Sequence, residues 1–93
     1  MLHPLTDQDS RTLALYGTDA CHLCEEAIAI LQQMTALQGW LLEWIDIADD
    51  EELLERYGAH IPVLRWPAGG VRLDWPFVAE DVLTLLAPAL SRL

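Results

Sequence analysis

The sequence contains no lysine, and its only residues with a permanent positive charge are five arginines. Fifteen aspartates and glutamates stand against them, and the 93-residue chain has a net charge of −10. Nucleic acids and anionic membrane surfaces bind proteins through clustered lysines and arginines. The charge therefore argues against both as partners, and we interpret the acid excess as a solubilising surface.

Long hydrophobic runs are also missing from the sequence. A membrane-spanning helix needs roughly 18 to 20 consecutive apolar residues, and no stretch approaches that length. The start of the chain carries neither the basic region nor the apolar stretch of a secretory signal. We therefore predict a cytoplasmic protein that makes no contact with a membrane.

Cysteine is scarce, since the chain has only Cys21 and Cys24. The cytoplasm keeps thiols reduced, so a pair separated by two residues is more plausibly reactive than structural. A buried dithiol without turnover is one alternative. Structural zinc is another, with His22 and His60 as further conceivable ligands, but such sites usually contain a second regularly spaced Cys or His pair, which is absent here. We therefore predict no metal site.

The chain is short enough to form one domain. Residues 1–10 are polar, contain a proline and show no periodicity. We therefore expect a flexible N-terminal extension over residues 1–10, followed by a single domain over residues 11–93.

The spacing of apolar residues predicts the order strand, helix, strand, helix, strand, strand, helix. The expected strands cover residues 12–16, 41–47, 61–66 and 71–75, and the expected helices begin near residues 18–20, 49 and 78. The first three elements form a βαβ unit, whose strands should pair in parallel through a right-handed crossover. The last two strands form a hairpin. The prediction is an α/β fold in which a four-stranded mixed sheet carries helices on both faces.

Particular residues predict where these helices begin and end. The apolar spacing of the first helix continues through Leu37, and Gly39 is expected to end it. Asp49 and Glu52 predict a capping box at the start of the second helix. Pro88 is expected to shorten the last helix, because proline lacks the amide that a helix interior needs.

The Cys21-x-x-Cys24 motif falls at the start of the first predicted helix, directly after a strand and its loop. In that context the motif is typical of a thioredoxin-like redox site. First-turn amides and the helix dipole stabilise a thiolate there, and a spacing of three residues puts both sulfurs on one helix face. We therefore expect Cys21, which is nearer the exposed end, to attack a disulfide and Cys24 to resolve the mixed disulfide.

Three segments resemble the small glutaredoxin-like proteins of bacteria, within the thioredoxin superfamily, over roughly residues 11–90. They are YGTDACHLCEEA at residues 16–27, the strand end Asp46-Ile47, and HIPVL at residues 60–64. The resemblance implies a thioredoxin-like fold, βαβαββα, with strand order 2-1-3-4. It also implies a cis peptide bond before Pro62, a Pro62 loop that faces the cysteines, and a backbone at Ile61 that pairs with an extended substrate.

The sequence departs from glutaredoxins at two places. The dipeptide between the cysteines is His22-Leu23 instead of Pro-Tyr, and Asp74-Trp75-Pro76-Phe77 replaces the Gly-Gly-x-Asp segment that holds glutathione. We therefore expect a protein disulfide to be the better substrate. Glutathione is the alternative partner and electron donor, bound weakly, and no resident cofactor is expected.

Four further residues are candidates for contacts with a substrate. His22 lies between the cysteines, where an imidazolium would favour a neighbouring thiolate, or else it is a solvated helix-start residue. His60 is either a proton donor to Cys21 or an ordinary loop histidine. Trp75 and Phe77 are expected to line a groove. The other tryptophans are interpreted as sheet and core aromatics: Trp40, Trp44 and Trp66.

These observations predict a monomeric thiol–disulfide oxidoreductase that uses Cys21 and Cys24 to reduce protein or low-molecular-weight disulfides. The alternative is a non-catalytic binding module that keeps the fold and uses the dithiol to bind a metal ion or a partner.

Overall fold

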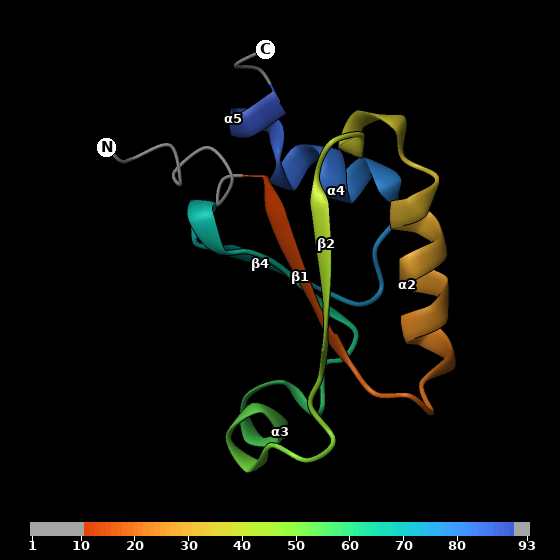
Figure 1. Cartoon of the computed structure of the whole chain (residues 1–93), viewed down its shortest axis with the longest axis vertical. Coiled ribbons are helices and arrows are strands. Elements are labelled where there is room, and N and C mark those ends of the chain that lie inside the picture. Colours follow the sequence, from red (N-terminus) through yellow and green to blue (C-terminus); the bar gives the residue numbers. More distant parts are fainter. Residues whose placement is uncertain (1–10, 91–93) are drawn as a thin grey trace.

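The computed structural model describes residues 11–90, so the extension expected at residues 1–10 lies outside the described part of the chain. The elements follow the predicted order of strands and helices (Figure 1). The strands are β1 (Thr12–Gly17), β2 (Leu41–Asp46), β3 (Val63–Trp66) and β4 (Val71–Asp74). The α-helices are α2 (His22–Gln32), α3 (Glu51–Tyr57), α4 (Ala79–Leu85) and α5 (Ala87–Leu90), and two 3₁₀ turns are η1 (Thr35–Leu37) and η2 (Pro67–Gly69).

The four strands form one sheet in the order β2-β1-β3-β4, as predicted. β1 and β2 are parallel, because α2 and η1 carry the chain back between them. β3 is antiparallel to β1 and to β4. The parallel βαβ unit and the hairpin of the sequence prediction are therefore both confirmed, and β1 lies in the interior of the sheet.

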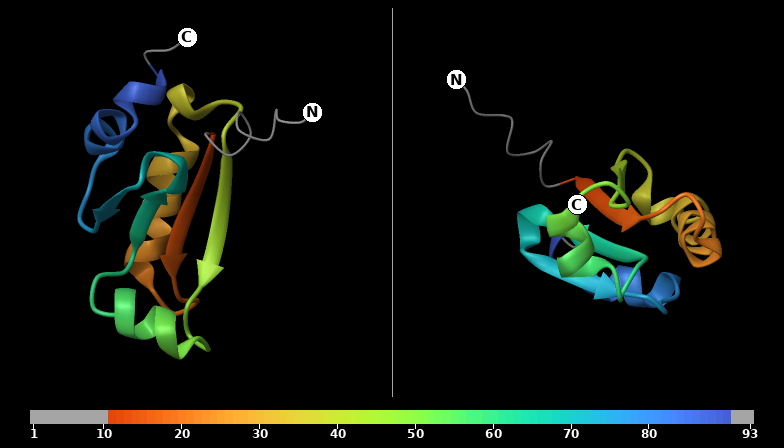
Figure 2. Two further views of the ribbon diagram at one scale, coloured as in Figure 1. Left: turned by 90° about the vertical axis from the view of Figure 1, so that its left-hand side faces the viewer. Right: turned by 90° about the horizontal axis from the view of Figure 1, so that it is seen from below.

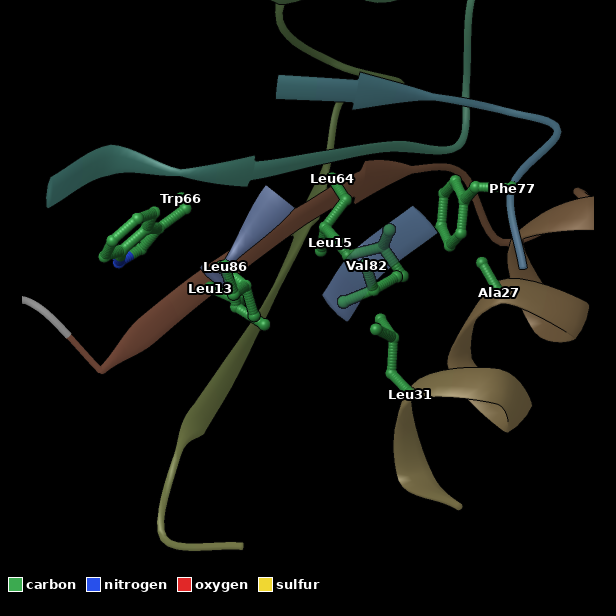
Figure 3. Close-up of a cluster of buried hydrophobic side chains, with 9 residues drawn as sticks. All are labelled: Leu13, Leu15, Ala27, Leu31, Leu64, Trp66, Phe77, Val82 and Leu86. Carbon is green, nitrogen blue, oxygen red and sulfur yellow. The ribbon is translucent and has the colours of Figure 1, made fainter. Parts of the chain in front are cut away.

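Side chains along β1 alternate between two apolar layers, because successive residues of a strand point to opposite faces. Leu13 and Leu15 face α2 and α4, while Ala14 and Tyr16 face α3, where the ring centroid of Tyr57 lies 4.4 Å from that of Tyr16. The buried residues of the first layer are Leu13, Leu15, Ala27, Leu31, Leu64, Trp66, Phe77, Val82 and Leu86 (Figure 3). Helices therefore cover both faces of the sheet, with α3 near one end (Figures 1 and 2).

The first helix is shorter than predicted at both ends. It begins at His22 instead of residues 18–20, because the sulfur of Cys21 caps it in place of a threonine or aspartate oxygen. It ends at Gln32, and the chain becomes extended at Met34 before η1. Met34 and Leu37 still pack against the same core cluster as Ala27 and Leu31 of α2. Their spacing therefore predicted correctly that they are turned towards the core, but the prediction of one continuous helix was wrong.

The other helices differ from the prediction at their ends as well. Asp50, and not Asp49, caps α3 by accepting a hydrogen bond from the Leu53 amide. The last helix is divided at Leu86 into α4 and α5, because a proline at residue 88 cannot donate within a continuous helix. No helix within residues 11–90 is long and apolar enough to cross a membrane.

We expect Leu15→Ala to lower the free energy of unfolding by about 2–5 kcal/mol, the usual cost of a cavity in a core. Leu15 is fully buried in β1, whereas Leu41 in β2 is 65 % exposed. Leu41→Ala is the matched control and should change stability by no more than about 0.5 kcal/mol. Urea titrations monitored by circular dichroism measure both, and equal losses would contradict the position of β1 in the core.

Candidate functional site

The two cysteines lie at the N-terminus of α2, where the loop after β1 turns back along the sheet. Cys21 is the N-cap of α2, and its Sγ accepts a hydrogen bond from the backbone N–H of Cys24 at 3.1 Å. Both residues are free thiols. Cys21 is partly exposed and Cys24 is only 1 % exposed, in the order that their positions in the sequence predicted. The pair therefore consists of one accessible sulfur and one enclosed sulfur.

The environment of Cys24 keeps its thiol protonated. Burial is the main reason why the pKa of Cys24 rises from 9.0 to about 12. The hydrogen bond with Cys21 and the charge of Cys21 raise this pKa further, and a hydrogen bond from the Thr18 backbone lowers it. Burial therefore disfavours the thiolate form of Cys24.

Gly17, the last residue of β1, leaves the space that the sulfur of Cys24 occupies. A Cβ atom at residue 17 would lie 2.5 Å from Cys24 Sγ and 2.8 Å from Cη2 of Trp44. Any larger residue would displace one of these two side chains. Glycine at this position therefore allows α2 to approach the end of β1 closely.

Pro62 lies across from Gly17 on the neighbouring strand. Tyr16 pairs with Val63, so the next pair along the antiparallel ladder is Gly17 and Pro62. The peptide bond before Pro62 is cis, as the resemblance implies. Pro62 is buried, and its carbonyl accepts a hydrogen bond from the Trp75 amide at 3.1 Å. The strand register thus brings the Pro62 loop and the cysteines to the same end of the sheet.

Ile61, the residue before this proline, is half-buried next to α3. Within residues 11–90, its backbone N–H and C=O form no hydrogen bond with another backbone group. Pairing between β3 and β4 begins only at Val63. The chain therefore has a short backbone segment before β3 that can accept a partner strand.

Among the described residues, no hydrogen bond or ion pair joins His22 or His60 to a cysteine sulfur. His22 is exposed in the first turn of α2. Nδ1 of His60 lies 3.6 Å from Oδ2 of Asp74, a carboxylate that also forms two hydrogen bonds with Arg72 at 2.9 and 3.0 Å. The Arg72 guanidinium lowers the pKa of Asp74, and His60 contributes a smaller effect in the same direction. The observed partner of His60 is therefore Asp74, and not Cys21.

The two aromatic candidates have different surroundings. Trp75 is half-buried, and its ring meets that of Phe77 edge-on, with the centroids 5.1 Å apart. Phe77 is 3 % exposed and packs in the core between the sheet, α2 and α4 (Figure 3). The prediction that Phe77 lines a groove is therefore wrong, because its side chain has almost no free surface. The peptide bond between Trp75 and Pro76 is also cis.

A hollow of about 280 Å³ lies beside the cysteines and was missed by the sequence analysis. Trp44, interpreted from the sequence as a sheet or core aromatic, lies in β2, is 38 % exposed and lines the hollow. The residues that line the hollow are Thr18, Asp19, Cys21, Cys24, Glu25, Ile28 and Trp44. The register of the parallel pair, in which Trp44 lies opposite Leu15, turns the indole towards α2. The register between β1 and β2 cannot be read from the sequence, because it is fixed by pairing in the folded chain.

Metal ligands are not gathered at this site. Among residues 11–90, no group of three or more His, Cys, Asp or Glu side chains has an arrangement that could hold a metal ion. The structure therefore does not bring together three of the four residues considered for zinc, namely Cys21, Cys24, His22 and His60.

Comparisons with known proteins agree with this architecture. The glutaredoxin-like domain family (DUF836) matches residues 12–87. The structural-genomics target protein XcR50 from X. campestris shares 41 % sequence identity with this chain. Its crystal structure superposes with a TM-score of 0.71, and the match covers 82 % of this chain and 96 % of the XcR50 chain. The solution structure of the same target gives a TM-score of 0.68 at the same identity, covering 82 % of this chain and 92 % of its own.

A more distant similarity concerns the fold alone. Thioredoxin 1 from Thermosipho africanus shares 13 % sequence identity with this chain and superposes with a TM-score of 0.61. The match covers 86 % of this chain and 94 % of the thioredoxin chain. A search of the curated proteins found no match. The family match spans most of the chain, and the paired cysteines, strand order and solved structures agree with it. The chain therefore belongs to the glutaredoxin-like domain family and has a thioredoxin-like fold.

Proposed function

We propose that this protein is a thiol–disulfide oxidoreductase that reduces protein disulfides through Cys21 and Cys24. The observation that carries this proposal is the asymmetry of the pair. The accessible sulfur of Cys21 caps α2, and the enclosed thiol of Cys24 lies one turn further along the same helix. An attacking thiol needs access and a stabilised thiolate, whereas a resolving thiol needs only to reach the first sulfur.

The proposed reaction has two exchanges. The Cys21 thiolate attacks one sulfur of the substrate disulfide, so that a Cys21–substrate bond forms, the substrate S–S bond breaks, and the leaving thiolate takes a proton from water. Cys24 then attacks Cys21 Sγ, which forms a Cys21–Cys24 disulfide and breaks the Cys21–substrate bond, and the proton from Cys24 goes to the departing sulfur, so that the second substrate thiol is released. The substrate gains two electrons and the protein dithiol loses two. An external thiol reductant then returns two electrons to the protein and restores its dithiol.

The position at the helix start favours the first exchange. The backbone N–H of Cys24 donates to Cys21 Sγ, and the positive end of the α2 dipole lies at the same point. Both interactions are stronger with a thiolate than with a thiol. Because the pKa of Cys24 is raised, that residue does not compete as a nucleophile before the mixed disulfide forms.

The Pro62 loop offers a docking edge for an extended substrate. The backbone of Ile61 is free of backbone partners within the described residues and precedes β3 at the same end of the sheet as the cysteines. A substrate strand that pairs there gains main-chain hydrogen bonds without a particular side chain. This arrangement supports a polypeptide as the substrate.

The segment before α4 supports weak binding of glutathione. The carboxylate of Asp81 already accepts a hydrogen bond from the Val78 amide at 2.9 Å, and Glu80 adds a second negative charge in the same turn. Asp74 is engaged by Arg72, and Phe77 is buried. An anionic tripeptide therefore meets repulsion there and few free donors.

The difference between the thiols predicts selective alkylation. Between pH 7 and 9, iodoacetamide should modify Cys21 more than about tenfold faster than Cys24, because Cys24 is enclosed and remains a neutral thiol. Because its pKa is raised to about 12 on folding, its thiolate fraction in the native state stays very small up to pH 9, and its rate should stay below that of Cys21 over this whole range. In urea the two rates should converge. Mass spectrometry of Cys21→Ser and Cys24→Ser resolves the two sites, and faster native labelling of Cys24 would reverse the assigned roles.

The exchange sequence predicts distinct products from the same two variants. Cys24→Ser should accumulate a mixed disulfide with a disulfide-bonded model peptide, whereas Cys21→Ser should release no peptide thiol. Measured thiol release and intact mass report both results.

The same assay separates the alternatives. Efficient turnover of a glutathione mixed disulfide by Cys24→Ser would indicate a glutathione-dependent enzyme and contradict the preference for protein substrates. A wild-type protein that exchanges with no disulfide would refute the oxidoreductase and leave the non-catalytic binding module.

A further inference from the structure

The hollow beside the cysteines lies on the opposite flank of the dithiol from the Pro62 loop. Gly17 pairs with Asp46 of β2 on one side and stands opposite Pro62 on the other. Trp44 belongs to β2, so its indole borders the cysteines on the β2 side. A substrate docked on the Pro62 loop therefore leaves this hollow open for an additional contact.

The walls of the hollow combine apolar and acidic groups. Trp44 and Ile28 supply apolar surface, and Asp19 and Glu25 supply two exposed carboxylates. Within the described residues, neither carboxylate lies within ion-pair distance of a basic side chain. The lining itself contains no arginine or histidine. The hollow therefore holds negative charge without a counter-charge, next to an exposed aromatic ring.

The arginines of the described chain are positioned elsewhere. Arg56 pairs with Glu52 on α3, and Arg72 pairs with Asp74 on β4. Arg65 on β3 contacts tyrosines of the face that α3 covers. Arg11 precedes β1, at the end of the strand opposite to Gly17. None of the arginines placed within residues 11–90 therefore supplies a cation to the hollow.

We propose that this hollow binds the arginine or lysine side chain of a disulfide-containing protein substrate, with the cation stacked on Trp44 between Asp19 and Glu25. The proposal rests on the proposed function and specifies its substrate class. A cation over an indole face is attracted by the ring quadrupole, and the aliphatic stem of the same side chain can pack on Ile28. The volume is slightly below the roughly 300–1,000 Å³ of small-molecule sites, which suits a single side chain.

A bound cation would also assist the chemistry next to it. Cys21 lines the same hollow as the two carboxylates, so a thiolate used in the proposed attack adds to their negative charges. A guanidinium or ammonium in the hollow counters them at the moment of attack. Charge complementarity over the whole molecule, at a net charge of −10, adds attraction for basic substrates in general.

The test uses disulfide-linked model peptides that differ at one residue. Arginine, glutamine or glutamate is placed at each position from two residues before to two residues after the reactive cysteine, and kcat/KM is measured with the wild-type protein. At one position or more, arginine should exceed glutamine by about tenfold and glutamate should be slowest, as expected for one cation–π contact with two adjacent carboxylates. Added salt should reduce this preference.

Matched variants separate the hollow from the overall charge. Glu25→Gln and Trp44→Leu should each bring the arginine-to-glutamine ratio towards one. Glu26→Gln is the control, because it makes the same change in net charge on the neighbouring residue, which does not line the hollow. If Trp44→Leu does not fold, the comparison of Glu25→Gln with Glu26→Gln still tests whether the hollow causes the preference for arginine.

Each result has a defined consequence. Equal rates for all peptides, or equal loss of preference in Glu25→Gln and Glu26→Gln, would overturn the cation site and leave the oxidoreductase intact. Failure of the wild-type protein to reduce any peptide would instead overturn the proposed function.

Discussion

The close packing of the Cys24 sulfur against the backbone of Gly17 determines the arrangement of the whole site. Because residue 17 has no side chain, the first turn of α2 can rest on the end of β1, and the Trp44 indole closes over the same point. A Cβ atom at residue 17 would force the helix, the indole or both to move. The position of Cys21, the enclosure of Cys24 and the hollow all depend on this contact.

The same contact makes two identical residues chemically different. Cys24 loses solvent on all sides, and its thiol is stabilised in the neutral form. Cys21, three residues earlier, remains at the helix end, where unpaired amides favour negative charge. Burial of one sulfur and the helix-end position of the other together distinguish the proposed resolving group from the proposed attacking group.

The sequence predicted those features that depend on local patterns. The alternation of Leu13, Ala14, Leu15 and Tyr16 predicted a buried strand with two apolar faces, and the motif after it predicted which helix carries the thiols. The strand order came from the resemblance to known proteins. The N-cap of α2 was mispredicted, because sulfur is not among the usual capping atoms.

Features that depend on packing between distant segments were not accessible from the sequence. Phe77 is preceded by a cis proline and enters the core, although its neighbour Trp75 remains half-exposed. The role of Trp44 depends on which residue of β1 it lies beside, and the apolar pattern of residues 41–47 fits several registers equally well. Side-chain direction in an edge strand follows from pairing, and pairing is a property of the folded chain.

The hydrogen bond from the Cys24 amide to Cys21 Sγ has a consequence for redox equilibrium. It stabilises the reduced dithiol, and most strongly its thiolate form, relative to a disulfide. Any interaction that favours the reduced form raises the reduction potential and makes the oxidised form a stronger oxidant. In the proposed reaction, the direction in which the dithiol exchanges electrons with a given partner therefore depends in part on this one backbone amide.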